Sequence, residues 1–213
     1  MIDHTTLALE FAKIIGCTRC TKSTDCNLLR DDQENVPQPG YVGSNYFSSR
    51  VLLVGQNPSS SNILEAQDRP YTESLRLLRD DPTPVHYREL SNVLETFIPQ
   101  WPVHGNYFPL KECGLKLSDI SYLNLVRCRT TSNKSPNVGV TENCSSQHFT
   151  HWLRMLSPRV VVFIGKWASN RVGSQVASLG IPHIYMNRLR SLSTTEREFN
   201  REQVVSLVKQ CRG

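Results

Sequence analysis

The residues best suited to chemistry are polar side chains that directly follow a predicted buried strand. Residues 51–54 form a short continuous apolar run, which is typical of a strand covered on both faces in a parallel sheet. Gly55, Gln56 and Asn57 come next and lead into a polar turn. Ligands of open α/β sheets bind at the carboxyl edge, so this turn is a better candidate for chemistry than an ordinary loop. From the residues alone, the alternative is that Asn57 is an ordinary Asx-turn residue.

Cysteines form a second group of candidates. The chain contains seven, an odd and high number for an intracellular protein, where cysteine clusters more often hold a metal than form disulfides. Cys17 and Cys20 make a CxxC pair, and Cys128 and Cys144 are separated by 15 residues. Four thiolates suit a tetrahedral zinc ion or a four-iron cluster equally well. Alternatively, Cys128 and Cys144 are small core side chains. The remaining cysteines are not assigned to the site: Cys26, Cys113 and Cys211.

Two further side chains stand out less clearly. Asn124 interrupts the apolar run 121–127, and a buried amide there requires hydrogen-bond partners, either a ligand or its own surroundings. Tyr71, taken alone, is an ordinary core aromatic. His183 lies inside a predicted strand and is interpreted as a core histidine.

Predicted strands alternate with helices along the chain and would position these side chains. The strands are expected at 51–54, 121–127, 159–164 and 180–186. The helices are expected at 4–16, over the second half of 68–78, and at 87–97, 141–156, 166–176 and 195–210. Residues 31–49 are predicted to be a long loop, and Thr195 with Glu198 a capping box for the last helix. This alternation predicts an α/β fold, a three-layer α/β/α sandwich with a mostly parallel four-stranded sheet. Its length favours a single domain over residues 1–213.

The net charge of +5 permits binding to a polyanion without proving it. The basic residues from Arg159 to Arg190 have no acid among them, which suggests a phosphate-facing surface or, equally, a solvated basic face. No run approaches about 18 apolar residues, and the start of the chain does not look like a signal peptide. We therefore expect a soluble, intracellular protein, cytoplasmic if prokaryotic, without a membrane partner.

Six short motifs in the chain resemble those of the uracil-DNA glycosylase superfamily, and most of all its iron-sulfur family 4 branch. That branch has an N-terminal CxxC, a strand ending in a polar Pro-containing turn, a G-R-P-F segment, an N-(V/L)-V-K-C-R strand end with a later cysteine, and a P-x-V-V-V-x-(L/I)-G strand. The corresponding segments of this chain are 17–20, 54–58, 68–71, 124–129, Cys144 and 158–165. Each motif is weak by itself, but together they keep their order over residues 10–165.

The resemblance implies a monofunctional DNA glycosylase, which flips uracil or a related modified base out of DNA and hydrolyses its glycosidic bond. Asn57 matches the asparagine that positions the attacking water in branches with a G-x-N-P turn. An amide is not a strong base at neutral pH, so Asn57 would orient the water rather than deprotonate it. The turn at Gly55 and Gln56 would hold the base carbonyl, and Tyr71 would stack on the base. Asn124 would read the edge of the pyrimidine.

The chain departs from the family pattern at three places, one of which is Ser59 in place of the usual glycine of the turn. Gln56 replaces the glutamate of family 4, and no His-Pro-Ser loop follows the fourth strand. Asn187, or Met186, is taken as the equivalent of that histidine, and Leu189 or Leu192 as the wedge that enters the base stack. The side chains assigned to DNA contact are Lys166, Arg188, Leu189 and Arg190.

The resemblance also implies a structural 4Fe-4S cluster on Cys17, Cys20, Cys128 and Cys144, with zinc as the second choice. The expected partner is DNA containing a damaged or deaminated base, bound by a monomer. The altered loop and Gln56 keep open a catalytically weak or inactive module that binds DNA lesions. An unrelated zinc protein with a doubly wound sheet is the third interpretation.

Overall fold

The computed structural model describes residues 2–20, 27–30, 35–59, 65–100, 108–187 and 193–212. By its internal contacts the chain divides into two compact units. The first comprises residues 1–40, 57–96 and 124–150, and the second residues 41–56, 97–123 and 151–213. The chain passes between the units five times, so neither is a continuous segment. We propose on this ground that residues 1–213 form one domain.

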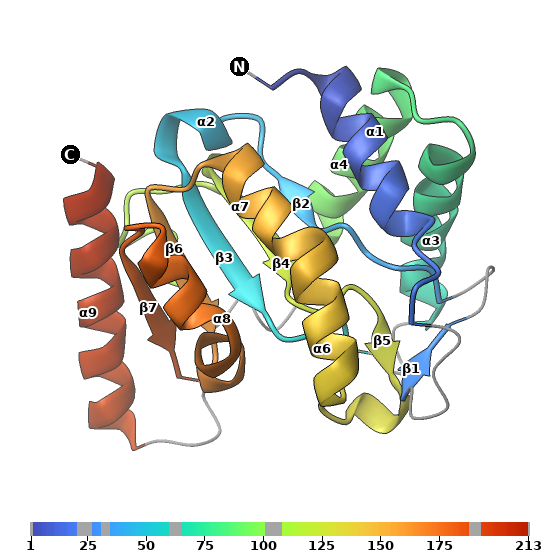
Figure 1. Cartoon of the computed structure of the whole chain (residues 1–213). Helices are drawn as coiled ribbons and strands as arrows, with labels where there is room; N and C mark the ends of the chain where they lie inside the picture. Colours follow the sequence, from blue (N-terminus) through green and yellow to red (C-terminus); the bar gives the residue numbers. More distant parts are fainter. Residues whose placement is uncertain are drawn as a thin grey trace. The chain divides into compact units, whose positions relative to one another are not determined.

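A five-stranded sheet forms the centre of the second unit (Figure 1). Its strands, in spatial order, are β2 (Tyr41–Val42), β4 (Ile120–Asn124), β3 (Val51–Gly55), β6 (Val160–Ile164) and β7 (His183–Met186). Strands β3, β6 and β7 are parallel, while β2 runs antiparallel to β4. The predicted α/β class is therefore confirmed. The predicted count of four strands is wrong, because the two-residue β2 lies in a polar segment that reads as a loop.

Helices cover both faces of this sheet. Helix α9 (Thr194–Arg212) places Val204 and Val208 in one apolar cluster with Val162 of β6. Side chains alternate along a strand, so Phe163 points to the opposite face. There its ring meets His183 at 6.0 Å, and a Cβ on Gly173 of helix α8 (Lys166–Ser178) would lie 3.6 Å from the His183 ring. The unit is therefore three-layered, and His183 is partly buried beside Phe163.

Shorter helices complete the second unit. They are α2 (Tyr46–Ser49), η1 (Ile98–Gln100), η2 (Leu117–Asp119) and α7 (Thr150–Leu156). The capping box of α9 is formed by Ser193 and Glu196, with the Ser193 hydroxyl 2.7 Å from Oε2 of Glu196. The predicted box of Thr195 and Glu198 is therefore wrong by two residues, because two overlapping S/T-x-x-E patterns occur in this stretch.

A side chain at position 43 is expected to destabilise the junction between β2 and β4. The N–H of Gly43 donates to the carbonyl of Ile120 at 2.9 Å, and a Cβ there would collide with the backbone of Ser118. We expect Gly43→Ala to lower the free energy of unfolding by about 1–3 kcal/mol, because backbone must shift to make room. Gly139→Ala is the matched control, since nothing lies within 4 Å of its Cβ. Urea denaturation measures both, and equal stability of the two variants would contradict the prediction.

The first unit contains helices and a small two-stranded ribbon. Its helices are α1 (His4–Ile15), α3 (Glu65–Asp80), α4 (Pro84–Phe97), the 3-10 helix η3 (Thr131–Asn133), α6 (Val138–Cys144) and the π-helix η4 (Ser145–Phe149). Strand β1 (Leu28–Leu29) pairs antiparallel with β5 (Arg129–Thr130). The N-cap Asp3 accepts from the N–H of Thr6 at 2.7 Å, and Phe11 packs edge-on against Tyr87 at 5.2 Å. The hydrogen bond caps α1, and the aromatic contact attaches α1 to α4.

None of the described helices combines the length and the apolar character that a membrane span requires.

Candidate active site

The side-chain amide of Asn57 is held by two hydrogen bonds. Its Nδ2 donates to the carbonyl of Pro58 at 3.0 Å and to Oγ1 of Thr130 at 3.1 Å. A carbonyl only accepts, so the group facing Pro58 must be the NH₂, and this fixes the orientation of the amide. Both amide hydrogens are used, and among the described residues no hydrogen bond to Oδ1 is found. The side chain therefore presents an acceptor oxygen, which suits it to orient a water molecule.

Thr130 supports Asn57 and was not identified from the sequence. It is fully buried in β5, where it is paired with Leu28 of β1. Its Oγ1 accepts from Asn57 and donates to the carbonyl of Lys134 at 2.6 Å. Because the Thr130 hydroxyl donates its hydrogen to Lys134, its oxygen can accept from the Asn57 amide. A threonine in a polar loop carries no sequence signal for such a role, because the partners are 73 and 4 residues away.

Tyr71 lies in the middle of α3 with only 2% of its surface exposed. It interacts electrostatically with Arg127, a guanidinium that is 1% exposed and donates from Nη1 to the carbonyl of Pro39 at 2.7 Å. Burial lowers the pKa of Arg127 to about 10, while Cys144 and Tyr71 act in the opposite direction. Arg127 is thus a buried cation of the first unit. In the sequence it is only a basic residue that follows an apolar run.

Three predicted site residues lie at strand ends of the sheet. Strand β3 ends at Gly55, with Gln56 directly after it, and Asn124 is the last residue of β4. Gln56 is 8% exposed and Asn124 7% exposed, so both amides are buried, which the sequence predicts for Asn124 alone. Buried amides at strand ends are suited to hydrogen-bond a polar ligand.

The remaining predicted residues of the second unit lie after β6 and β7. Lys166 is exposed at the first position of α8, with Nζ 5.6 Å from the centre of the Tyr185 ring. Asn187 follows β7, and its backbone N–H donates to Oδ1 of Asn200 at 2.9 Å. Asn200 was not identified from the sequence. Three other DNA-contact candidates lie outside the described residues: Arg188, Leu189 and Arg190.

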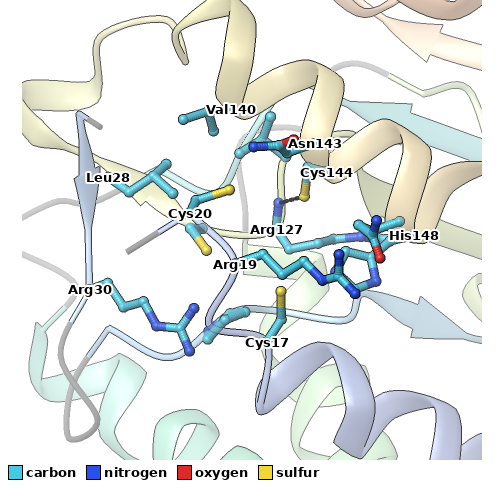
Figure 2. Close-up of a pocket in the computed structure, with 14 residues that line it drawn as sticks. Cys17, Arg19, Cys20, Leu28, Arg30, Arg127, Val140, Asn143, Cys144 and His148 are labelled. Atoms are coloured by element: carbon cyan, nitrogen blue, oxygen red, sulfur yellow. Dashed lines mark hydrogen bonds between the residues drawn. The ribbon is translucent and has the colours of Figure 1, made fainter. Parts of the chain in front are cut away.

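The four predicted metal ligands line one pocket of the first unit. Figure 2 shows Cys17 and Cys20, which come after α1, and Cys144, which ends α6, around the same space. Cys128 belongs to the same lining. The backbone N–H of Arg127 donates to Sγ of Cys144 at 3.4 Å (dashed in Figure 2). An N–H donor directed at sulfur is a common feature of metal–thiolate sites.

The pocket lining suits an anionic centre. Burial raises the pKa of Cys144 to about 11 and also raises that of Cys128, so a metal would have to displace their protons. Arg19, Arg30 and Arg127 also line the pocket, and its described lining includes no Asp or Glu. In the described part of the chain, however, no group of three or more Cys, His, Asp or Glu side chains is arranged to hold a metal ion. The donor set thus fits a thiolate-bound metal, while the geometry is not that of a closed site.

The family model of the Uracil DNA glycosylase superfamily matches residues 43–208. The chain therefore belongs to this superfamily, whose members hydrolyse N-glycosidic bonds of bases in DNA. The match includes Cys128 and Cys144, whereas Cys17 and Cys20 precede it. It does not single out the family 4 branch. A search of curated proteins finds no match to the chain.

Proposed function

We propose that this protein is a monofunctional DNA glycosylase that excises uracil or a related modified base. The observation that carries the proposal is Asn57, whose amide is fixed by Pro58 and Thr130 so that Oδ1 is presented as an acceptor. Membership of the superfamily supplies the reaction class and a DNA substrate.

The reaction sets two demands on the protein. The base leaves as an anion from a sugar with oxocarbenium character, so its negative charge must be stabilised by hydrogen-bond donors. A water must also be aligned with the anomeric carbon. Asn57 would accept a hydrogen bond from that water through Oδ1 and so direct its oxygen. It would not deprotonate the water, because an amide is not a base at neutral pH.

Base recognition falls to the other predicted residues. Tyr71 would stack on the flipped base, a contact of about 1–3 kcal/mol. Asn124 offers both a donor and an acceptor to the pyrimidine edge, and the turn at Gly55 and Gln56 offers donors to a base carbonyl. Asn187 takes the role of the missing histidine. Lys166, and Arg188, Leu189 and Arg190 beyond the described residues, would contact the DNA.

We further propose a 4Fe-4S cluster on Cys17, Cys20, Cys128 and Cys144, as in the family 4 branch, with zinc as the second choice. Such a centre would hold the segments around its ligands together and take no part in hydrolysis, which moves no electrons. Four thiolates give it a negative charge, which would lie beside the buried guanidinium of Arg127. This charge match supports a metal–thiolate centre of either kind.

A lesion-binding module without activity is the second candidate. The features that favour it are Gln56 in place of the family 4 glutamate and the absence of a His-Pro-Ser loop. The loss of the histidine removes a hydrogen-bond donor to the departing anionic base. A pure binder, however, does not need an oriented acceptor such as Asn57.

The test is excision by the purified protein on labelled oligonucleotides that each carry one uracil, hydroxymethyluracil, hypoxanthine or xanthine. Alkali then cleaves the strand at any abasic site, and DNA affinity is measured in parallel. We expect cleavage at one or more pyrimidine lesions. Tight, lesion-dependent binding without cleavage at any base would favour the module, and neither binding nor cleavage would overturn both candidates.

A further inference from the structure

The side chain of Asn200 bridges two backbone groups at the end of β7. Oδ1 of Asn200 accepts from the N–H of Asn187 at 2.9 Å, and Nδ2 of the same amide donates to the carbonyl of Tyr185 at 3.0 Å. The two bonded backbone groups flank Met186. One amide thus satisfies a donor and an acceptor on the same side of the chain, as a neighbouring strand would.

The position of β7 explains why such a bridge is needed. This strand is the last in the sheet order, so no strand of the described part of the chain lies beside its outer backbone groups. On its inner side, the carbonyl of Met186 accepts from the N–H of Gly165 at 2.7 Å. Residues 185–187 are consequently held from both sides, by β6 through Met186 and by α9 through Asn200.

Asn200 is itself held by a rigid element. It lies one helical turn before Val204, so the two project from the same face of α9. Val204 and Val208 are fully buried against the sheet, and the Ser193–Glu196 box fixes the start of the helix. The amide of Asn200 is therefore attached to a packed helix rather than to a mobile loop.

We infer that Asn200 is a positioning residue that sets the place of Asn187 and, through Tyr185, the ring beneath Lys166. It acts through these residues and does not touch the substrate. The inference rests on the proposed function for its effect on excision, but the bridge can be tested separately. If Asn187 stabilises the departing base, its placement by Asn200 should affect turnover more than DNA binding.

The first test is a double-mutant cycle with Asn200→Ala and Asn187→Ala. We expect Asn200→Ala to reduce kcat about 10- to 100-fold with little change in KM. The double variant should be no slower than Asn187→Ala alone, because Asn200 acts through Asn187. Asn200→Asp retains the acceptor oxygen and should recover part of the lost activity. Fully additive losses in the cycle would overturn the inference.

The second test does not depend on activity. Amide hydrogen exchange, followed by NMR, should show a protected Asn187 N–H in the wild type and a loss of protection of at least 10-fold in Asn200→Ala. The N–H of Gly165 is the internal control, since its bond to Met186 does not involve Asn200. Unchanged protection of Asn187 would overturn the inference. Lost protection in a protein that excises no base would refute the proposed function and leave the positioning of Asn187 established.

Discussion

Asn57→Ala is expected to reduce excision at least about 100-fold while DNA affinity stays close to that of the wild type. The substitution removes the only oxygen assigned to the water and touches no group assigned to DNA contact. Single-turnover excision and equilibrium binding to the same lesion oligonucleotide measure the two effects. Wild-type excision by Asn57→Ala would refute the water-positioning role.

Thr130 provides a graded control for this result. Thr130→Val keeps the shape of the side chain but removes the hydroxyl that accepts from Asn57. We expect a loss of about 10-fold, smaller than that of Asn57→Ala, because Pro58 still holds one amide hydrogen. Thr130→Ser retains the hydroxyl and should stay near the wild type. Equal activity of the valine and serine variants would show that the Thr130 contact is unimportant.

The second large effect concerns the cysteine pocket. Cys17→Ala and Cys128→Ala should each lose the bound metal and lower the free energy of unfolding by more than about 3 kcal/mol, because metal binding to a thiolate site contributes directly to folding. The visible absorbance, the content of iron, sulfide and zinc, and urea denaturation report these changes. Four irons per chain would support the cluster, and one zinc per chain the second choice.

Cys113 provides the matched control for the pocket. It is 1% exposed, lies in the apolar cluster of the second unit, and is not among the residues that line the thiolate pocket. Cys113→Ala should cost about 1 kcal/mol and leave the metal content unchanged. Metal retained at the wild-type level in Cys128→Ala, with unchanged stability, would contradict the assignment of the ligands.

The central strands could be predicted because their sequences leave little choice. The continuous apolar runs of β3 and β6 are buried throughout, as is typical of strands in a parallel sheet that is covered on both faces. Strand β2 could not be predicted, since Tyr41 and Val42 stand in a polar stretch and pair through the backbone with β4. Its presence depends on a partner nearly 80 residues away, which local sequence does not reveal.

Only part of the candidate site could be predicted, because the local sequence pattern marks only some of its residues. Gln56 and Asn124 could be located because they directly follow or end an apolar run. Thr130 and Asn200 could not, because each acts through a hydrogen bond to a residue distant in sequence. Arg127 was read only as one position of a motif. Its enclosure beside Tyr71 and Cys144 became apparent only from the fold.

The most direct measurement is release of free base from an oligonucleotide with a single uracil, detected by mass spectrometry together with the abasic strand. We predict equal amounts of free uracil and abasic strand from the metal-loaded protein, with an uncut phosphodiester backbone, as expected of a monofunctional hydrolase. No release of uracil or of any other base in the lesion panel, by metal-loaded protein that still binds the DNA, would contradict the assignment of glycosylase activity.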